Sequence, residues 1–137
     1  FLVATNMGEV MMGKIKSGYS DVYRLIVLSY LNNKDFAQAI RYAKEAIALG
    51  MGYREIFLLY AARASYELGH YQASIKLIKE ALAIDPRYAE AYELLSQNLD
   101  ATQQSPMAEQ MKTRAKLLKE QNGMKYPGPN EVNLRIL

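Results

Sequence analysis

The chain has 137 residues, of which 50% are hydrophobic and 23% are charged, and it contains no cysteine. This length suits one domain with a modest continuous core, and the absence of thiols excludes disulfides, thiolate catalysis and cysteine-type zinc sites. No apolar run is long enough to span a bilayer, although the sequence is compatible with an anchor preceding Phe1. These properties leave the compartment open, with the cytoplasm slightly favoured.

The net charge of +3 is unevenly distributed. Residues 1–104 contain 11 basic and 11 acidic residues, whereas residues 105–137 contain 6 basic and 3 acidic ones. This basic segment could contact an acidic partner or nucleic acid, but a solvated outer face is the favoured interpretation. Residues 105–121 contain no aromatic side chain that could stack on a base, so nucleic acid is not an expected partner.

The first predicted element is a helix over residues 4–16, which Lys16-Ser17-Gly18 ends. We interpret residues 1–19 as a capping helix or as the remnant of a preceding segment. Ser20 is then expected to be the N-cap of a helix over residues 21–32, because a serine hydroxyl accepts a hydrogen bond from a free N–H of the first turn.

Asp35 is predicted to cap the next helix, with Gln38 completing a pair that resembles a capping box. This second helix ends at Gly50, since glycine adopts left-handed backbone angles at low cost. Further helices are predicted at about 54–68, 71–84, 88–102 and 106–121, separated by Gly69, Asp85-Pro86 and Ser105-Pro106.

The last segment, residues 122–137, is predicted to be an extended tail. Pro127-Gly128-Pro129-Asn130 interrupts any helix there. The residues after it, 132–137, alternate well enough between apolar and polar side chains to dock as a strand or in a groove. We therefore expect the tail to fold back on its own chain or to insert into a neighbouring molecule.

The chain aligns with itself at a shift of 34 to 35 residues. Small residues recur at two positions of this repeat: Ala39, Ser74 and Ala108, and then Ala46, Ala81 and Ala115. Small side chains at such spacing suit a tight crossing of two helices, where larger ones would push the backbones apart. A period of this length is the signature of an array of helical hairpins, and such arrays mostly bind other molecules.

The clearest unit, residues 55–88, has a turn glycine at Gly69, an aromatic at Tyr71, the pair Ala81-Leu82 and the terminator Asp85-Pro86. In these features it resembles a tetratricopeptide repeat. The resemblance covers three units, which we place at 20–54, 55–88 and 89–121. The chain departs from the family pattern at three places, where Lys34, Gly50-Met51-Gly52 and Gln103-Gln104-Ser105-Pro106 stand.

The resemblance implies an all-α fold, a right-handed superhelix of three helical hairpins with an N-terminal helix and an extended C-terminal tail. It also implies a protein-interaction module, a scaffold or adaptor that holds a peptide or helix of a partner in its concave groove. The alternative is a structural or oligomerisation segment of a larger assembly, which would use the end helices, the convex face or the tail and could form a homo-oligomer.

In this family the first helix of each unit lines the concave side. Carried over residue by residue, the resemblance assigns partner contact to Arg24, Leu28, Leu31, Leu59, Arg63, Tyr66, Glu93 and Gln97. A groove of this composition suits an extended peptide with apolar side chains and both signs of charge. The equally weighted alternative is that some of these side chains face a neighbouring helix or the tail.

The sequence gives little indication of a catalytic site. The one histidine, His70, follows the turn residue Gly69, where an exposed side chain is far more common than a catalyst. Gly50-Met51-Gly52 lacks the spacing and the following lysine of a phosphate loop. We therefore expect no enzymatic activity, no cofactor and no metal site.

The expected role of the tail leads to a first prediction. Deleting residues 123–137 should lower the melting temperature or change the oligomeric state, because the apolar side chains near the end of the tail would no longer cover apolar surface. Thermal melting and light scattering on the full and shortened chains measure both effects. An unchanged melting curve together with an unchanged mass would show that the tail is an idle linker.

Overall fold

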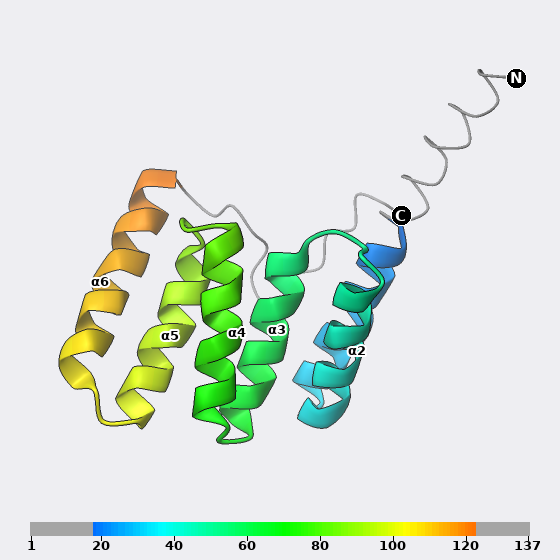
Figure 1. Ribbon diagram of the computed structural model, residues 1–137, viewed down its shortest axis with the longest axis horizontal. Helices are drawn as coiled ribbons and strands as arrows, with labels where there is room; N and C mark the ends of the chain where they lie inside the picture. Colours follow the sequence, from blue (N-terminus) through cyan, green and yellow to red (C-terminus); the bar gives the residue numbers. More distant parts are fainter. Residues whose placement is uncertain (1–17, 123–137) are drawn as a thin grey trace, which may run out of the picture.

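The computed structural model describes residues 18–122, and this part of the chain consists of helices joined by short turns, without a strand (Figure 1). The helices cover residues 18–32, then Phe36–Ala48 (α2), Arg54–Glu67 (α3), Tyr71–Ile84 (α4), Ala89–Ala101 (α5) and Ser105–Asn122 (α6). Successive helices pack as antiparallel hairpins that stack side by side. The prediction of an all-α array of hairpins is confirmed.

The two ends of the chain fall largely outside the described residues. The helix predicted over residues 4–16 and nearly all of the tail predicted over 122–137 belong to these parts. Among the described helices, none combines the length and apolarity needed to cross a membrane.

The start of the first described helix differs from the prediction. The backbone is already helical at Gly18, so Ser20 lies inside the helix and is not its N-cap. Its side chain is fully buried, and its Oγ has no hydrogen-bond partner among residues 18–122. Ser20 therefore serves as a small residue at a packed position, a role that the sequence pattern of an N-cap does not distinguish from capping.

The small residues of the repeat occupy the predicted places. Ala39, Ser74 and Ala108 are fully buried, and so are Ala46, Ala81 and Ala115, about two turns further along the same helical face. Each set lies on the second helix of its hairpin, on α2, α4 and α6. Because no large side chain stands there, the neighbouring helices approach closely and exclude water.

The same backbone turn ends the first helix of every hairpin, although three different residues form it. Lys34, Gly69 and Gln103 all have left-handed angles, with φ of 60°, 79° and 62°. In each turn the following N–H donates to a carbonyl five residues back: Asp35 to Tyr30 (2.9 Å), His70 to Ser65 (2.9 Å) and Gln104 to Leu99 (2.7 Å). This pairing is the Schellman motif, and it explains how the first and third turns form without the family's glycine.

The core has two hydrophobic clusters, and α3 contributes to both. Phe57 and Ala61 belong to the cluster shared with α2, while Leu59 and Ala62 belong to the cluster shared with α4, α5 and α6. Nine of the 14 residues of α3 are buried. The central helix is thus enclosed on several sides, which matches its lack of a polar face.

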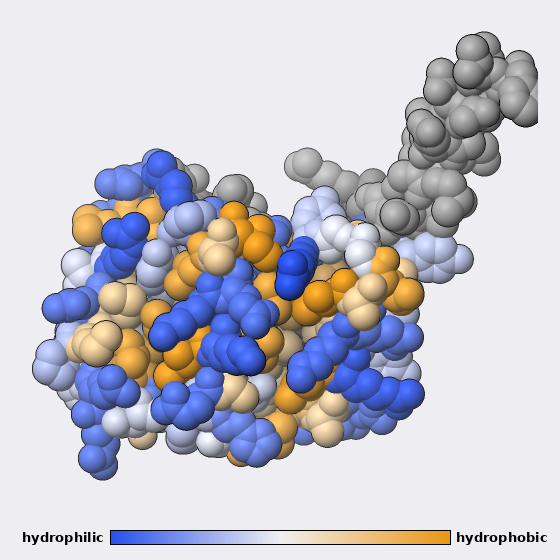
Figure 2. All heavy atoms as spheres, viewed as in Figure 1, coloured by the Kyte–Doolittle hydropathy of each residue, from blue (hydrophilic) through white to orange (hydrophobic). Residues whose placement is uncertain are grey.

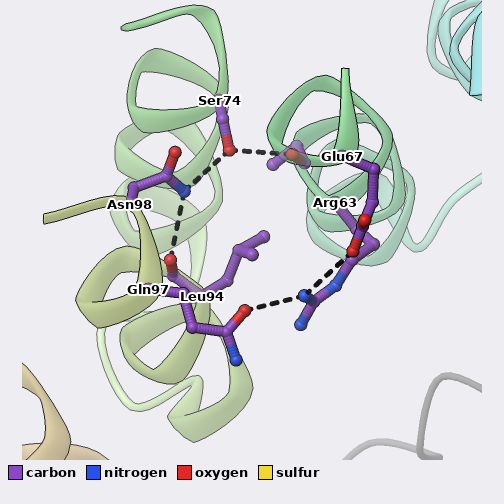
Figure 3. Close-up of polar contacts among 7 residues, drawn as sticks. Arg63, Glu67, Ser74, Leu94, Gln97 and Asn98 are labelled. Atoms are coloured by element: carbon purple, nitrogen blue, oxygen red, sulfur yellow. Dashed lines mark hydrogen bonds and ion pairs between the residues drawn. The ribbon is translucent and has the colours of Figure 1, made fainter. Parts of the chain in front are cut away.

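A buried hydrogen-bond network joins three helices behind the second cluster (Figure 3). The Ser74 hydroxyl of α4 donates to the Ala62 carbonyl of α3 at 2.7 Å. The Asn98 amide of α5 donates to the Ser74 hydroxyl at 2.9 Å and to the Leu94 carbonyl at 3.1 Å. Buried polar groups need such partners, so the network fixes the register of α5 against the central hairpin.

The tight crossing at Ala81 leads to a second prediction. Ala81→Leu should destabilise the fold by about 1–3 kcal/mol, because the larger side chain overpacks a fully buried position. Ala83→Leu is the matched control, since Ala83 is exposed on the same helix and should tolerate the change. Urea unfolding of both variants measures the difference, and equal midpoints for the two would contradict the assigned register.

Candidate functional site

A small hollow lies among the first helices of the three hairpins. Its volume is about 80 Å³, and four of its lining residues are predicted partner contacts: Leu31, Leu59, Arg63 and Glu93. Tyr60, Tyr88, Glu90 and Leu94 complete the lining. The hollow has an apolar floor and a polar rim, which is the usual composition of a site for one side chain of a ligand.

Arg63 is held across the boundary between α3 and α5. Its Nη1 donates to the Gln97 Oε1 at 2.8 Å and lies 4.0 Å from the Glu67 carboxylate (Figure 3). Its guanidinium also lies 5.9 Å from the centre of the Tyr66 ring, within range of a cation–π contact. The structure therefore brings three predicted residues, Arg63, Tyr66 and Gln97, into one contacting group.

The Tyr66 ring is oriented by a second aromatic residue. It lies 5.7 Å from the ring of Tyr71 at an interplanar angle of 58°. Tyr71 begins α4, so the contact joins the two helices of the central hairpin just beside their turn. The half-buried Tyr66 thus presents part of its surface in a fixed orientation.

The acidic side of the hollow is partly neutralised. Glu93 forms an ion pair with Lys119 of α6. Burial raises the pKa of the Glu90 carboxyl above its ordinary value, and the nearby Lys119 ammonium opposes that rise. Lys119 was not expected at the site, because its distance along the chain hides its proximity to α5.

Two predicted residues lie in the interior of the first hairpin and do not line the hollow. Leu28 is 3% exposed and belongs to the first hydrophobic cluster. Arg24 is 5% exposed, and its Nη1 bonds the Asp21 carboxylate at 3.2 Å. The charge of Arg24 also acts on Tyr60, whose hydroxyl pKa is raised by burial and partly lowered by the guanidinium.

The lining residues Tyr60, Tyr88 and Leu94 were missed because the sequence argument used only fixed positions of each first helix. Tyr60 and Leu94 directly follow predicted positions, Leu59 and Glu93, so the hollow extends around each helix by one residue. Tyr88 precedes α5 and stands one residue before the unit 89–121, from which the positions were counted. A wider count that included large aromatic neighbours would have found Tyr60.

The chemistry of the described residues favours binding. Residues 18–122 contain no group of three metal-ligating side chains that could hold an ion. His70 is exposed at the turn before α4, as expected. The hollow of about 80 Å³ is much smaller than the roughly 300–1,000 Å³ of a typical small-molecule site, so one inserted side chain fills it.

Comparison with known proteins agrees with this geometry. Residues 30–98, half of the chain, match the tetratricopeptide repeat family. The chain therefore belongs to the tetratricopeptide repeat family, as the sequence resemblance indicated. Repeats of this family generally mediate protein–protein interaction, and its members are typically non-enzymatic scaffolds.

A curated relative is the TPR repeat-containing protein YpiA of Bacillus subtilis (strain 168). It is 33% identical over 82 residues, which are 60% of this chain and 19% of the relative. The chain thus spans less than two thirds of the length of this relative, about a fifth of it. The similarity concerns a segment of a longer repeat protein.

The half-buried carboxyl of Glu90 leads to a third prediction. Its raised pKa means that the carboxyl binds a proton more readily in the folded chain than in the unfolded chain. The free energy of unfolding therefore falls as the pH rises above the ordinary value of 4.5 and the carboxyl becomes charged. Glu90→Gln should therefore raise the melting temperature at pH 7, and the gain should vanish at about pH 4, where the wild-type carboxyl is protonated.

Glu93→Gln is the matched control for this experiment. It removes the partner of Lys119 and also the like charge beside Glu90, two effects that oppose each other, so it should change the melting temperature at pH 7 less than Glu90→Gln does. Calorimetry of both variants at the two pH values measures the effect. A gain for Glu90→Gln that is the same at both pH values would contradict the titration of this residue.

Proposed function

We propose that the chain is a protein-interaction module that holds a peptide or helix of a partner protein along the first helices of its hairpins. The observation that carries this proposal is the hollow beside the fixed group Arg63, Tyr66 and Gln97. An apolar side chain of the partner enters the hollow against Leu31 and Leu59. Arg63, Tyr66 and Gln97, which lie beside the hollow, contact the backbone of the partner.

The charges of the site support recognition of a largely neutral, apolar segment. Arg63 is satisfied by Gln97 and Glu67, and Glu93 by Lys119. A charged partner must compete with these contacts, whereas an apolar side chain displaces only water. The existing bonds also hold the side chains in place before binding, which lowers the entropic cost of association.

A second candidate function, a segment of a larger assembly, is supported by apolar side chains on the end helices. Tyr19, Val22 and Leu25 recur at steps of three along the first described helix, with exposures of 55%, 49% and 37%. On α6, Met107 and Leu117 are each 50% exposed. Such faces suit contact with a further helix, either of another hairpin or of a second copy.

A fourth prediction tests the groove directly. Peptides selected for binding from a displayed random library should lose affinity for Arg63→Ala and Tyr66→Ala by about 2 kcal/mol or more each, because tyrosine and arginine are frequent binding hot spots. Fluorescence anisotropy with the selected peptides measures the affinities. Circular dichroism should show unchanged helicity, since both side chains are only half-buried.

Arg41→Ala is the matched control for these variants. Arg41 is exposed on α2, and its guanidinium lies 5.6 Å from the centre of the Tyr42 ring, a contact like that of Arg63 with Tyr66. The control should bind the selected peptides like the wild type. If Arg41→Ala weakens binding while Arg63→Ala and Tyr66→Ala do not, recognition uses the outer face, and light scattering then decides whether the chain self-associates.

A further inference from the structure

The opposite face of the array has a larger hollow, between the second helices of the first two hairpins. We call it the α2–α4 slot; its volume is about 460 Å³, and its main lining residues are Lys44, Ile47, Arg54, Leu58, Lys76 and Leu77. In Figure 1 the central helix α3 lies between α2 and α4. Because α3 packs on both helices, it forms the floor of the slot.

The floor is apolar and the rim is cationic. Leu58 is buried, and Ile47 and Leu77 are half-buried beside the first hydrophobic cluster. Lys44, Arg54 and Lys76 are exposed. Figure 2 shows hydrophobic surface interrupted by hydrophilic side chains on this face of the molecule.

The cations of the rim, Lys44, Arg54 and Lys76, form no ion pair with the described residues, 18–122. The one acidic residue among the lining, Glu80, forms no ion pair in that range either. This differs from the groove on the other face, where Arg63 pairs with Glu67 and Glu93 pairs with Lys119.

The shape of the slot suits a helix. Its lining follows α3 from Arg54 to Ser65, which is about 16 Å along the helix axis at 1.5 Å per residue. That length corresponds to about three turns of a helix lying along the slot. Such a helix would place apolar residues on the floor at spacings of three and four, and its flanks would lie beside the cationic rim.

We propose that the α2–α4 slot binds an acidic amphipathic helix of a partner protein. The apolar stripe of that helix covers Ile47, Leu58 and Leu77, and carboxylates on its flanks pair with Lys44, Arg54 and Lys76. This surface is separate from the groove of the first helices, so one chain can hold two partner segments at once.

Charge complementarity also favours an acidic partner helix over two other possible occupants, the chain's own tail and a second copy of the chain. Residues 123–137 of the chain's own tail contain Lys125 and Arg135 against a single acid, Glu131, so the tail carries the wrong net charge for the rim. A second copy docked by two-fold symmetry would bring one cationic slot against the other. Both arrangements place like charges together, which is unfavourable.

The test uses three labelled synthetic peptides of 15 residues and the full chain. The first has leucines at helical spacing flanked by glutamates, the second has lysine in place of every glutamate, and the third is a scrambled form of the first. Fluorescence anisotropy gives the dissociation constants, and chemical-shift mapping locates the bound peptide. We expect the first peptide alone to bind saturably, with shifts centred on residues 44–48 and 73–80.

Charge reversal on the rim provides the decisive variant. Lys44→Glu combined with Lys76→Glu should raise the dissociation constant of the first peptide at least about tenfold, because carboxylates then face carboxylates. Both residues are exposed, so the melting curve should change little. Lys116→Glu on α6 is the matched control, since Lys116 is also exposed but does not line the slot; it should leave the dissociation constant within about twofold.

Several results would overturn the proposal. These are the absence of saturable binding, equal binding of the lysine or scrambled peptide, a footprint outside the slot, or an equal loss in the Lys116→Glu control. Tighter peptide binding after deletion of residues 123–137 would identify the chain's own tail as the occupant. A concentration-dependent dimer whose chemical-shift changes map to the slot would identify a second copy in that role.

Discussion

The close approach of helices at the small residues is the constraint on which the rest of the structure depends. Ala39, Ser74 and Ala108 let each second helix pack directly on its neighbours. That spacing brings the first helices near enough for Arg63 of α3 to bond Gln97 of α5. It also places Ser74 where its hydroxyl joins Ala62 to Asn98. A larger residue would separate the helices and remove both contacts together.

The charged side chains Arg63 and Glu93 are paired in the groove of the first helices, but those at the rim of the α2–α4 slot are unpaired among the described residues. On the groove side, polar side chains from neighbouring helices bond one another, so that surface is ordered before any partner arrives. On the slot side, Lys44, Arg54 and Lys76 form no ion pair with the described residues. The groove therefore has a fixed shape that suits a largely neutral, apolar segment. The slot has an excess of positive charge that suits an acidic one.

The sequence predicted the features that depend on local pattern. The repeat period located the hairpins and the buried small residues, and Asp35 caps α2 by accepting a hydrogen bond from the Gln38 N–H, as expected. It did not predict contacts between distant positions, such as Glu93 with Lys119, because no local signal encodes them. It also misassigned Ser20, since a serine at a helix start and a serine at a tight crossing look alike in one sequence.

The burial of α3 between its neighbours affects the order in which the helices unfold. Because α3 contributes residues to both hydrophobic clusters, the hairpins are not independent modules, and removing either neighbour exposes apolar residues of α3. Within residues 18–122 we therefore expect α3 to be the last helix to lose its packing partners when the structure opens locally. Such an opening exposes an apolar helix face, so we expect a partly unfolded form of this region to associate with other apolar surfaces.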